Sequence, residues 1–196
     1  MSREKLTTSE RILETTVLLL EQHQGRGVRM SDIARQSRVS RQAIYLHFAS
    51  RTELLCAATR FLDSRLELDK RLEPSRLATS GVSRLENYIA FWGHYIPEIY
   101  GVAKALMLAE ATDEAAATAW EDRCNAMREG CQAAICALAK DNHLAEEWTV
   151  DTATDALWTQ LLIPNWESLT QQCGWSTERY IERMTAIAKA SFVRQN

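Results

Sequence analysis

The side chains best suited to molecular recognition lie in one short stretch, Ser40-Arg41-Gln42-Ala43-Ile44-Tyr45. If this stretch is helical, Ala43 and Ile44 project to one side, while the longer polar side chains of Arg41 and Gln42 project to another. Arg and Gln form bidentate hydrogen bonds with guanine and adenine in the major groove of DNA. An apolar inner side lets a preceding helix hold the stretch at a fixed angle. The pattern is typical of the second helix of a helix-turn-helix.

Two preceding helices are expected to position this stretch. The first starts at Thr8 or Ser9, either of which can cap it, and the second covers residues 30–37. A tight turn follows, and Ser40 is the expected N-cap of the third helix. The apolar stripes that indicate the first two helices consist of Ile12, Leu13, Thr16, Val17 and Leu20, and of Met30, Ile33 and Ala34.

A fourth helix is expected over residues 51–72, because Ser50 and Glu53 have the spacing of a capping box and Pro74 follows. The expected organisation is a helix-turn-helix domain over 1–50, a connecting helix over 51–74 and a second domain over 75–196. The second domain is expected to be helical over 82–96, 98–112, 114–141, 149–172 and 176–193, with a break at Pro97 and a kink or split at Pro164.

The composition supports an all-α protein of about nine helices. The chain of 196 residues contains only 3 Pro and 7 Gly, which favours long helices over a turn-rich β architecture. The early residues are charged and polar rather than apolar, which is not the pattern of a signal peptide. The longest early apolar run is too short to span a membrane. A cytoplasmic location is therefore expected.

The net charge of −3 is divided unequally along the chain. Residues 1–51 contain nine Lys and Arg and five Asp and Glu, which is a net charge of +4. The remaining residues contain 14 basic and 21 acidic side chains, which is a net charge of −7. A basic head on an acidic body indicates that the head alone meets phosphates.

Enzyme motifs are missing from the sequence. It contains no nucleophile and base motif, no phosphate-binding loop and no CxxC or HExxH spacing. A di-metal site of the kind found in helical bundles uses Glu-x-x-His pairs, and there are none. The five cysteines have no paired spacing and are interpreted as small apolar residues, with thiol redox sensing as a minor alternative. No metal and no cofactor is expected.

The stretch from Asp32 to Leu55 closely resembles the TetR family of one-component transcriptional repressors. The family pattern contains a DIA-like helix, a GVS-like turn, a short helix with a tyrosine, a His-Phe or Tyr-Phe pair and an SKxxL-like helix start. The matching segments are Asp32-Ile33-Ala34, Arg38-Val39-Ser40, Tyr45, His47-Phe48 and Ser50-Arg51-Thr52-Glu53-Leu54. The detailed match covers about residues 8–62, and beyond it only the layout is similar.

The resemblance implies roles in binding double-stranded operator DNA. Ser40 is expected to bind a phosphate at the helix N-terminus. Arg41 and Gln42 are expected to reach base edges, Arg suiting a guanine and Gln an adenine. Tyr45 and His47 are expected to contact the DNA backbone of one strand.

Four further residues are interpreted from the same resemblance. Arg51 stands where the family usually has Lys, and its amide and side chain can hold a phosphate. Phe48 is expected to be a core residue. Arg38 replaces the usual turn glycine, which predicts either a positive φ with modest strain or a slightly different turn. Arg29 replaces the usual threonine, which removes a helix cap but adds a cation near the DNA, and Ser31 or water can serve the free amides instead.

The resemblance also implies that the second domain forms a homodimer and binds a small molecule. The last two long helices are expected to pair with those of a second subunit, so that the operator is a pseudo-palindrome. The apolar residues expected at this interface are Leu157, Leu161, Ile181, Met184, Ile187 and Phe192. A largely apolar effector that releases the DNA is expected in a pocket lined by Tyr88, Phe91, Trp92, Tyr95, Tyr100, Met107, Trp120, Met127 and Trp158.

The sequence leaves alternatives open. Tyr45 and His47 could shield the core of the small domain, and Arg35 and Arg38 could be solvated surface charges. The aromatic and apolar residues of the second domain could form an ordinary core. The protein could also be an activator, or a regulator that needs no small-molecule inducer.

Overall fold

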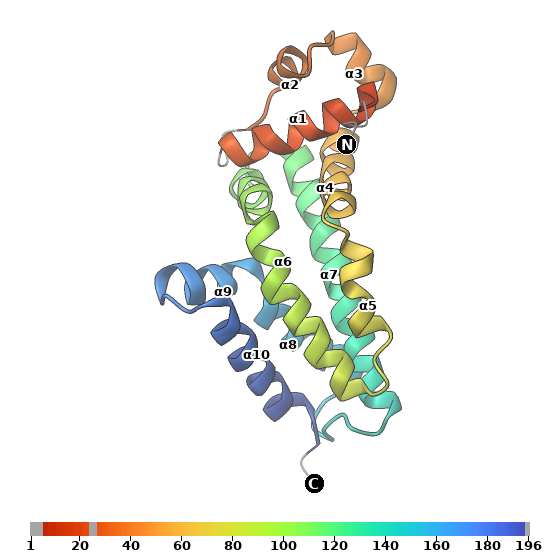
Figure 1. Ribbon diagram of the computed structural model, residues 1–196, viewed down its shortest axis with the longest axis vertical. Helices are drawn as coiled ribbons and strands as arrows, with labels where there is room; N and C mark the ends of the chain where they lie inside the picture. Colours follow the sequence, from red (N-terminus) through yellow and green to blue (C-terminus); the bar gives the residue numbers. More distant parts are fainter. Residues whose placement is uncertain (1–5, 24–26, 195–196) are drawn as a thin grey trace, which may run out of the picture. The chain divides into compact units, whose positions relative to one another are not determined.

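The computed structural model describes residues 6–23 and 27–194, and its regular elements within those ranges are helices (Figure 1). An all-α fold is therefore confirmed. The elements are α1 (Thr8–His23), α2 (Met30–Ser37), α3 (Arg41–His47), α4 (Arg51–Arg65), α5 (Leu68–Arg76), α6 (Gly81–Ala109), α7 (Glu114–Lys140), α8 (Val150–Leu161), α9 (Ile163–Glu167), the π-helix η1 (Ser168–Gln172) and α10 (Thr177–Phe192).

The chain divides into two compact units. Unit 1 consists of Met1–Leu68 and Ile99–Arg123, and unit 2 of Asp69–Glu98 and Cys124–Asn196. Helices α6 and α7 each contribute one end to each unit. The sequence indicated that everything after residue 75 belongs together, whereas residues 99–123 pack with the N-terminal helices.

Short side-chain caps start several helices at the positions that the sequence indicated. The Ser50 hydroxyl accepts a hydrogen bond from the amide of Glu53 at 3.0 Å, and the Glu53 carboxylate accepts one from the Ala49 amide at 2.6 Å. At the start of α1, Thr7 is the cap rather than Thr8 or Ser9, since its hydroxyl accepts from the Glu10 amide at 3.2 Å. These caps satisfy amides that have no partner within the helix.

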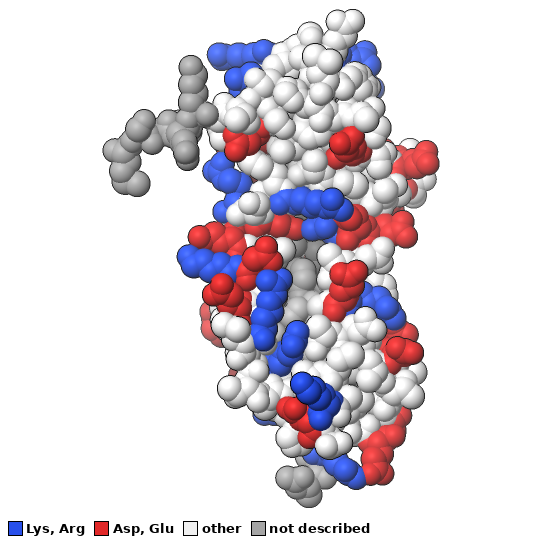
Figure 2. Space-filling model, turned by 90° about the vertical axis from the view of Figure 1, so that its right-hand side faces the viewer, with Lys and Arg blue, Asp and Glu red and all other residues white. Residues whose placement is uncertain are grey.

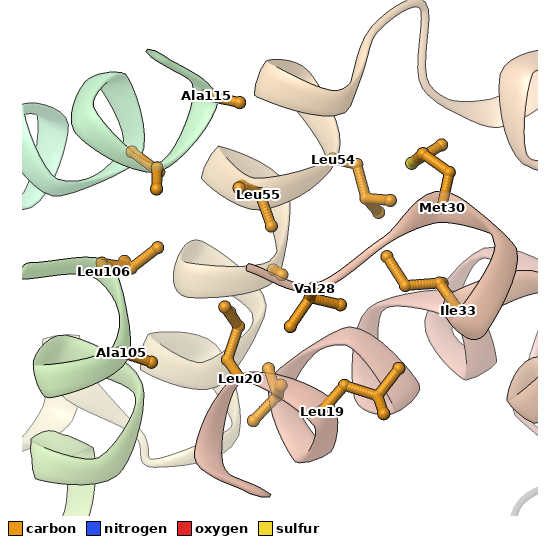
Figure 3. Packing of buried hydrophobic residues seen from close by; sticks show 14 of the residues in the cluster. Leu19, Leu20, Val28, Met30, Ile33, Leu54, Leu55, Ala105, Leu106 and Ala115 are labelled. Carbon is orange, nitrogen blue, oxygen red and sulfur yellow. The ribbon is translucent and has the colours of Figure 1, made fainter. Parts of the chain in front are cut away.

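The core of unit 1 holds the helix-turn-helix together (Figure 3). Ile12 of α1 and Ile33 of α2 are completely buried, as are Leu54 and Leu55 of α4. Leu106 of α6 joins the same cluster. The apolar stripes predicted for the first two helices are therefore confirmed, and the end of α6 is an additional wall of this core.

The helix expected over 51–72 is two helices. Helix α4 ends at Arg65, and Glu67 has a φ of 53°, in the left-handed region. A residue in that conformation interrupts a right-handed helix. Pro74 lies inside α5 instead of ending it.

The break expected at Pro97 is wrong, because α6 runs continuously from Gly81 to Ala109. Proline removes one helical hydrogen bond and crowds the preceding turn. Tyr95 and Ile96 before it and Val102 after it are buried, and packing on both sides offsets that cost. The effect expected at Pro164 is confirmed, since α8 ends at Leu161 and Pro164 stands in the first turn of α9.

Candidate nucleic-acid interface

The turn between α2 and α3 has the conformation expected from its sequence. Arg38 has φ 56° and ψ 45°, the left-handed conformation that glycine adopts more easily. This geometry allows the Val39 amide to donate to the Ala34 carbonyl at 3.0 Å. The final carbonyls of α2 are thereby paired, and the chain reverses directly into α3.

Helix α3 has the predicted inner and outer sides. Ile44 is completely buried, and Phe48, which follows the helix, is 6% exposed. The outer side chains are all exposed: Arg41, Gln42, Tyr45, Leu46 and His47. The alternative in which Tyr45 and His47 shield the core is disfavoured by this exposure, while their contact with DNA stays a prediction.

Ser40 occupies the position predicted for a phosphate contact. Its hydroxyl oxygen accepts a hydrogen bond from the Ala43 amide at 3.0 Å and thus caps α3. The residue is exposed, so its hydroxyl is also accessible to solvent. The geometry leaves Ser40 free to donate to a DNA phosphate.

Arg29 is the N-cap residue of α2. Among the residues that the structure describes, its side chain makes no capping hydrogen bond. Its carbonyl accepts hydrogen bonds from the amides of Asp32 and Ile33 at 2.9 and 3.2 Å. The side chain is exposed. Arg35 has an 80% exposed side chain and pairs with Asp32 at 3.0 Å, which favours the interpretation of Arg35 as a solvated surface charge.

Arg51 pairs with an acidic residue of the same chain that the sequence did not indicate. Its guanidinium donates to both carboxylate oxygens of Asp113, at 2.5 and 2.6 Å, and to the Val28 carbonyl at 3.1 Å. The two side chains are 24% and 18% exposed. Arg51 therefore joins the loop before α2, the start of α4 and the turn between α6 and α7. A phosphate contact by Arg51 stays a prediction and would have to compete with Asp113.

The environment of Asp113 stabilises its charged form. Burial raises the pKa of this carboxyl, but hydrogen bonds and the charge of Arg51, with the amides of Ala115 and Ala116, outweigh burial. The pKa of Asp113 consequently lies below its ordinary value. The carboxylate also caps α7, because it accepts from the Ala116 amide at 3.3 Å.

A second ion-pair cluster joins α4 to the start of α7 in the same unit. Arg60 of α4 donates to Asp122 at 2.7 Å, and Arg123 donates to Asp122 at 2.6 Å and to Asp63 at 2.5 Å. Burial raises the pKa of Asp122, but hydrogen bonds from the two arginines outweigh it and leave this pKa lowered. The sequence could not indicate this cluster, because the pair Arg60 and Asp63 is about 60 residues away from the pair Asp122 and Arg123.

Three arginines line an open cavity of about 760 Å³ in unit 1: Arg29, Arg41 and Arg51. The opposite charges Asp113 and Glu114 line it as well. Figure 2 shows basic side chains without acidic neighbours at the end where α2 and α3 lie in Figure 1, whereas acids and bases alternate over much of the remaining face. This distribution agrees with the basic head expected from the sequence.

The predicted pocket residues are divided between the two units. Tyr100, Met107 and Trp120 belong to unit 1, where Trp120 packs against the core of the helix-turn-helix. The other six belong to unit 2. They are Tyr88, Phe91, Trp92, Tyr95, Met127 and Trp158. The nine residues therefore do not lie in one compact unit, and their role in a ligand pocket stays a prediction.

The aromatic residues of α6 form a packed cluster in unit 2. The ring of Phe91 lies 5.0 Å from that of Tyr95 and 5.2 Å from that of Trp92, measured between centroids. The Tyr88 hydroxyl donates to the Met127 carbonyl at 2.7 Å. Phe91, Tyr95 and Met127 are buried. These contacts favour the interpretation of this cluster as core.

Most residues predicted for the dimer interface lie inside one chain. Leu157, Leu161 and Phe192 are completely buried, and Met184 is 5% exposed. A side chain without exposed surface adds almost no buried area when two chains associate. Ile187 is 46% exposed and Ile181 is half-buried. The prediction of an interface is therefore confined to Ile181, Ile187 and the exposed side of α10.

The described residues contain no group of three or more His, Cys, Asp or Glu side chains that could hold a metal ion. Over the same residues, no helix is both long and apolar enough to cross a membrane.

Several solved structures have the same fold. The model superposes with a TM-score of 0.73 on a chain described as a transcriptional regulator from Saccharomonospora viridis in complex with choline, at 18% identity over 95% of this chain and 98% of that one. It superposes equally well on a TetR-family regulator from Rhodococcus sp., at 19% identity over 94% and 97% of the two chains.

A third structure, the regulator FadR from Bacillus subtilis in complex with stearoyl-CoA, superposes with a TM-score of 0.73 at 12% identity, over 92% of this chain and 97% of that one. No curated protein matches the sequence. The model of the family described as bacterial regulatory proteins, tetR family, matches residues 12–58, which include α2, the turn and α3. Residues 12–58 are therefore similar to the bacterial regulatory proteins of the tetR family, and the fold of the chain is the one found in such regulators.

Proposed function

We propose that the chain binds double-stranded operator DNA by placing α3 in the major groove. The observation that supports this most strongly is the arrangement of α3, in which Ile44 is buried while Arg41 and Gln42 are exposed. Neither polar side chain contributes to the core, and both are suited to base edges. Ser40, Tyr45, His47 and Arg29 then contact the flanking phosphates.

The protein acts as a homodimer on a pseudo-palindromic operator. The exposed side of α10 supplies the interface, and its apolar contacts come from the exposed Ile187 and the half-buried Ile181. A twofold dimer presents two copies of α3 about 34–36 Å apart, or somewhat further, to successive major grooves. Replacing the exposed Ile187 with glutamate is expected to shift the protein toward the monomer in sedimentation velocity.

Binding of a small, largely apolar molecule in unit 2 releases the DNA. The protein then acts as a repressor, and its location is the cytoplasm. Several buried polar atoms in unit 2 lack a hydrogen-bond partner among the described residues, and they include Nε1 of Trp158, Oε1 of Gln160 and the hydroxyl of Tyr180. Buried polar groups without partners are costly, and a ligand or second protomer would supply the partners. Structures of the same fold contain choline or stearoyl-CoA.

Selection of DNA from a random pool by the purified protein tests this function. The expected result is an enriched inverted repeat whose half-sites are about one helical turn apart or somewhat more. Failure to enrich any sequence at low salt would contradict operator binding. Ligand response is tested separately by thermal shift with choline and stearoyl-CoA as first probes. An effector must raise the Tm and also lower affinity for the selected DNA.

A further inference from the structure

Leu46 is the one apolar side chain among the exposed residues of α3, and it is 86% exposed. The other exposed residues of this helix are Arg41, Gln42, Tyr45 and His47. A leucine side chain that moves from water into an apolar contact gains free energy in proportion to the area that it buries. In the single chain, Leu46 gains almost none of this.

The fold does not require leucine at this position. Ile44 and Phe48 supply the contacts that fix α3 to the core, and they are 0% and 6% exposed. Alanine would serve the helix at least as well, since it has the highest helix propensity. The apolar side chain is therefore available for a contact outside the chain.

Helical spacing places Leu46 on the DNA-reading side. Residues four apart lie on the same face of an α-helix, so Leu46 lies one turn after Gln42, which is also exposed. One turn rises about 5.4 Å along the helix axis. Since base pairs are about 3.4 Å apart, the two side chains reach positions within about two base pairs of each other.

The major groove offers one apolar group for such a contact. Guanine, cytosine and adenine present hydrogen-bonding atoms there, whereas thymine also presents its C5 methyl group. Resting on the operator binding proposed above, we propose that Leu46 contacts the methyl group of a thymine and determines specificity. Each half-site then contains a T·A pair within about two base pairs of the adenine that Gln42 reads.

Replacement of thymine by deoxyuridine tests this contact, because it removes the methyl group and keeps every hydrogen-bonding atom. The operator obtained by selection is substituted at one thymine at a time, and Kd is measured by fluorescence anisotropy. At the contacted thymine, the wild-type protein is expected to bind about fourfold more weakly, the value for one buried methyl group. Leu46→Ala is expected to bind both duplexes equally.

Leu77→Ala is the matched control, since Leu77 is 76% exposed but lies outside the DNA-binding helices. This variant is expected to keep the wild-type sensitivity to deoxyuridine. Leu46→Met, which restores an apolar side chain, is expected to recover most of that sensitivity. The Tm of Leu46→Ala is expected to equal that of the wild type, which shows that the variant is folded.

The outcomes separate this inference from the proposed function. If the protein prefers the selected operator but Leu46→Ala keeps the wild-type sensitivity at every thymine, the inference is wrong and the proposed function stands. If Leu46→Ala weakens binding to all sequences equally, Leu46 contacts the backbone and the inference is also wrong. If the wild-type protein prefers no sequence, the proposed function fails and the inference fails with it.

Discussion

The outer side of α3 and the aromatic side of α6 show two different uses of large side chains. On α3, Arg41, Gln42 and Leu46 are exposed and contribute little to the fold. On α6, Phe91 and Tyr95 are buried and contact each other. A side chain that the fold does not need indicates recognition, whereas one that fills the interior fits both a core and a ligand site.

The first prediction could break this contrast, because it tests whether the α6 cluster is core. Phe91→Ala is expected to lower the free energy of unfolding by about 4 kcal/mol, as for other large aromatic residues removed from a core. Urea denaturation followed by circular dichroism measures the change. A loss below about 1 kcal/mol would mean that the ring lines open space, and the cluster would again be a candidate ligand site.

The second prediction sharpens the contrast within α3 itself. Ile44→Ala is expected to lower the free energy of unfolding by about 3 kcal/mol, because it leaves a cavity in the core of unit 1. Gln42→Ala, two residues earlier on the exposed side, is expected to change it by less than about 0.5 kcal/mol. Equal effects of the two substitutions in the same denaturation experiment would contradict the assignment of inner and outer sides.

The third prediction concerns Asp113, a charged residue with a structural role. Asp113→Asn keeps a side chain that can cap α7 but removes the charge that pairs with Arg51. The expected loss of unfolding free energy is about 2 kcal/mol at neutral pH, the range for a hydrogen bond between charged groups.

The pH dependence of that loss follows from the lowered pKa of Asp113. A lowered pKa means that the stabilisation is complete above the ordinary value of 3.8 and is lost as the pH falls through the lower value in the folded protein. The difference between wild type and Asp113→Asn is therefore expected to be constant from neutral pH down to about pH 5, to shrink as the pH falls further and to vanish in strong acid. A difference that persists in strong acid would contradict a charge-based role.

The fourth prediction has the smallest expected effect. Arg38→Gly is expected to raise the free energy of unfolding by up to about 1 kcal/mol, since glycine adopts a φ of 56° without the strain of a side chain. Arg38→Ala is the control, because it removes the charge but keeps the strain, and it is expected to leave stability nearly unchanged. If Arg38→Ala stabilises as much as Arg38→Gly, the cause is charge rather than backbone conformation.

The sequence predicts the N-terminal helices well, because local signals agree there. The stripe of Met30, Ile33 and Ala34 indicates α2, and the caps Ser40 and Ser50 mark the starts of α3 and α4. The break at Pro97 was wrong, because tertiary packing overrides the preference of a single residue.

The sequence predicts the candidate site only in part. The exposed residues of α3 follow from periodicity, but the partner of Arg51 does not, since Asp113 is 62 residues away. The same limit applies to Leu157 and Phe192, which have an apolar pattern that fits an interface but are buried within one chain. Periodicity tells which side of a helix is apolar and does not tell which element covers it.

The central claim, that the outer side of α3 reads DNA, is tested most directly by fluorescence anisotropy on the selected operator and on a shuffled duplex. The wild-type protein is expected to prefer the operator, with affinity that falls steeply as salt increases. Arg41→Ala/Gln42→Ala is expected to lose at least about 100-fold in affinity for the operator, to bind both duplexes alike and to keep the wild-type Tm. A double variant that still prefers the operator to the same degree would contradict the claim.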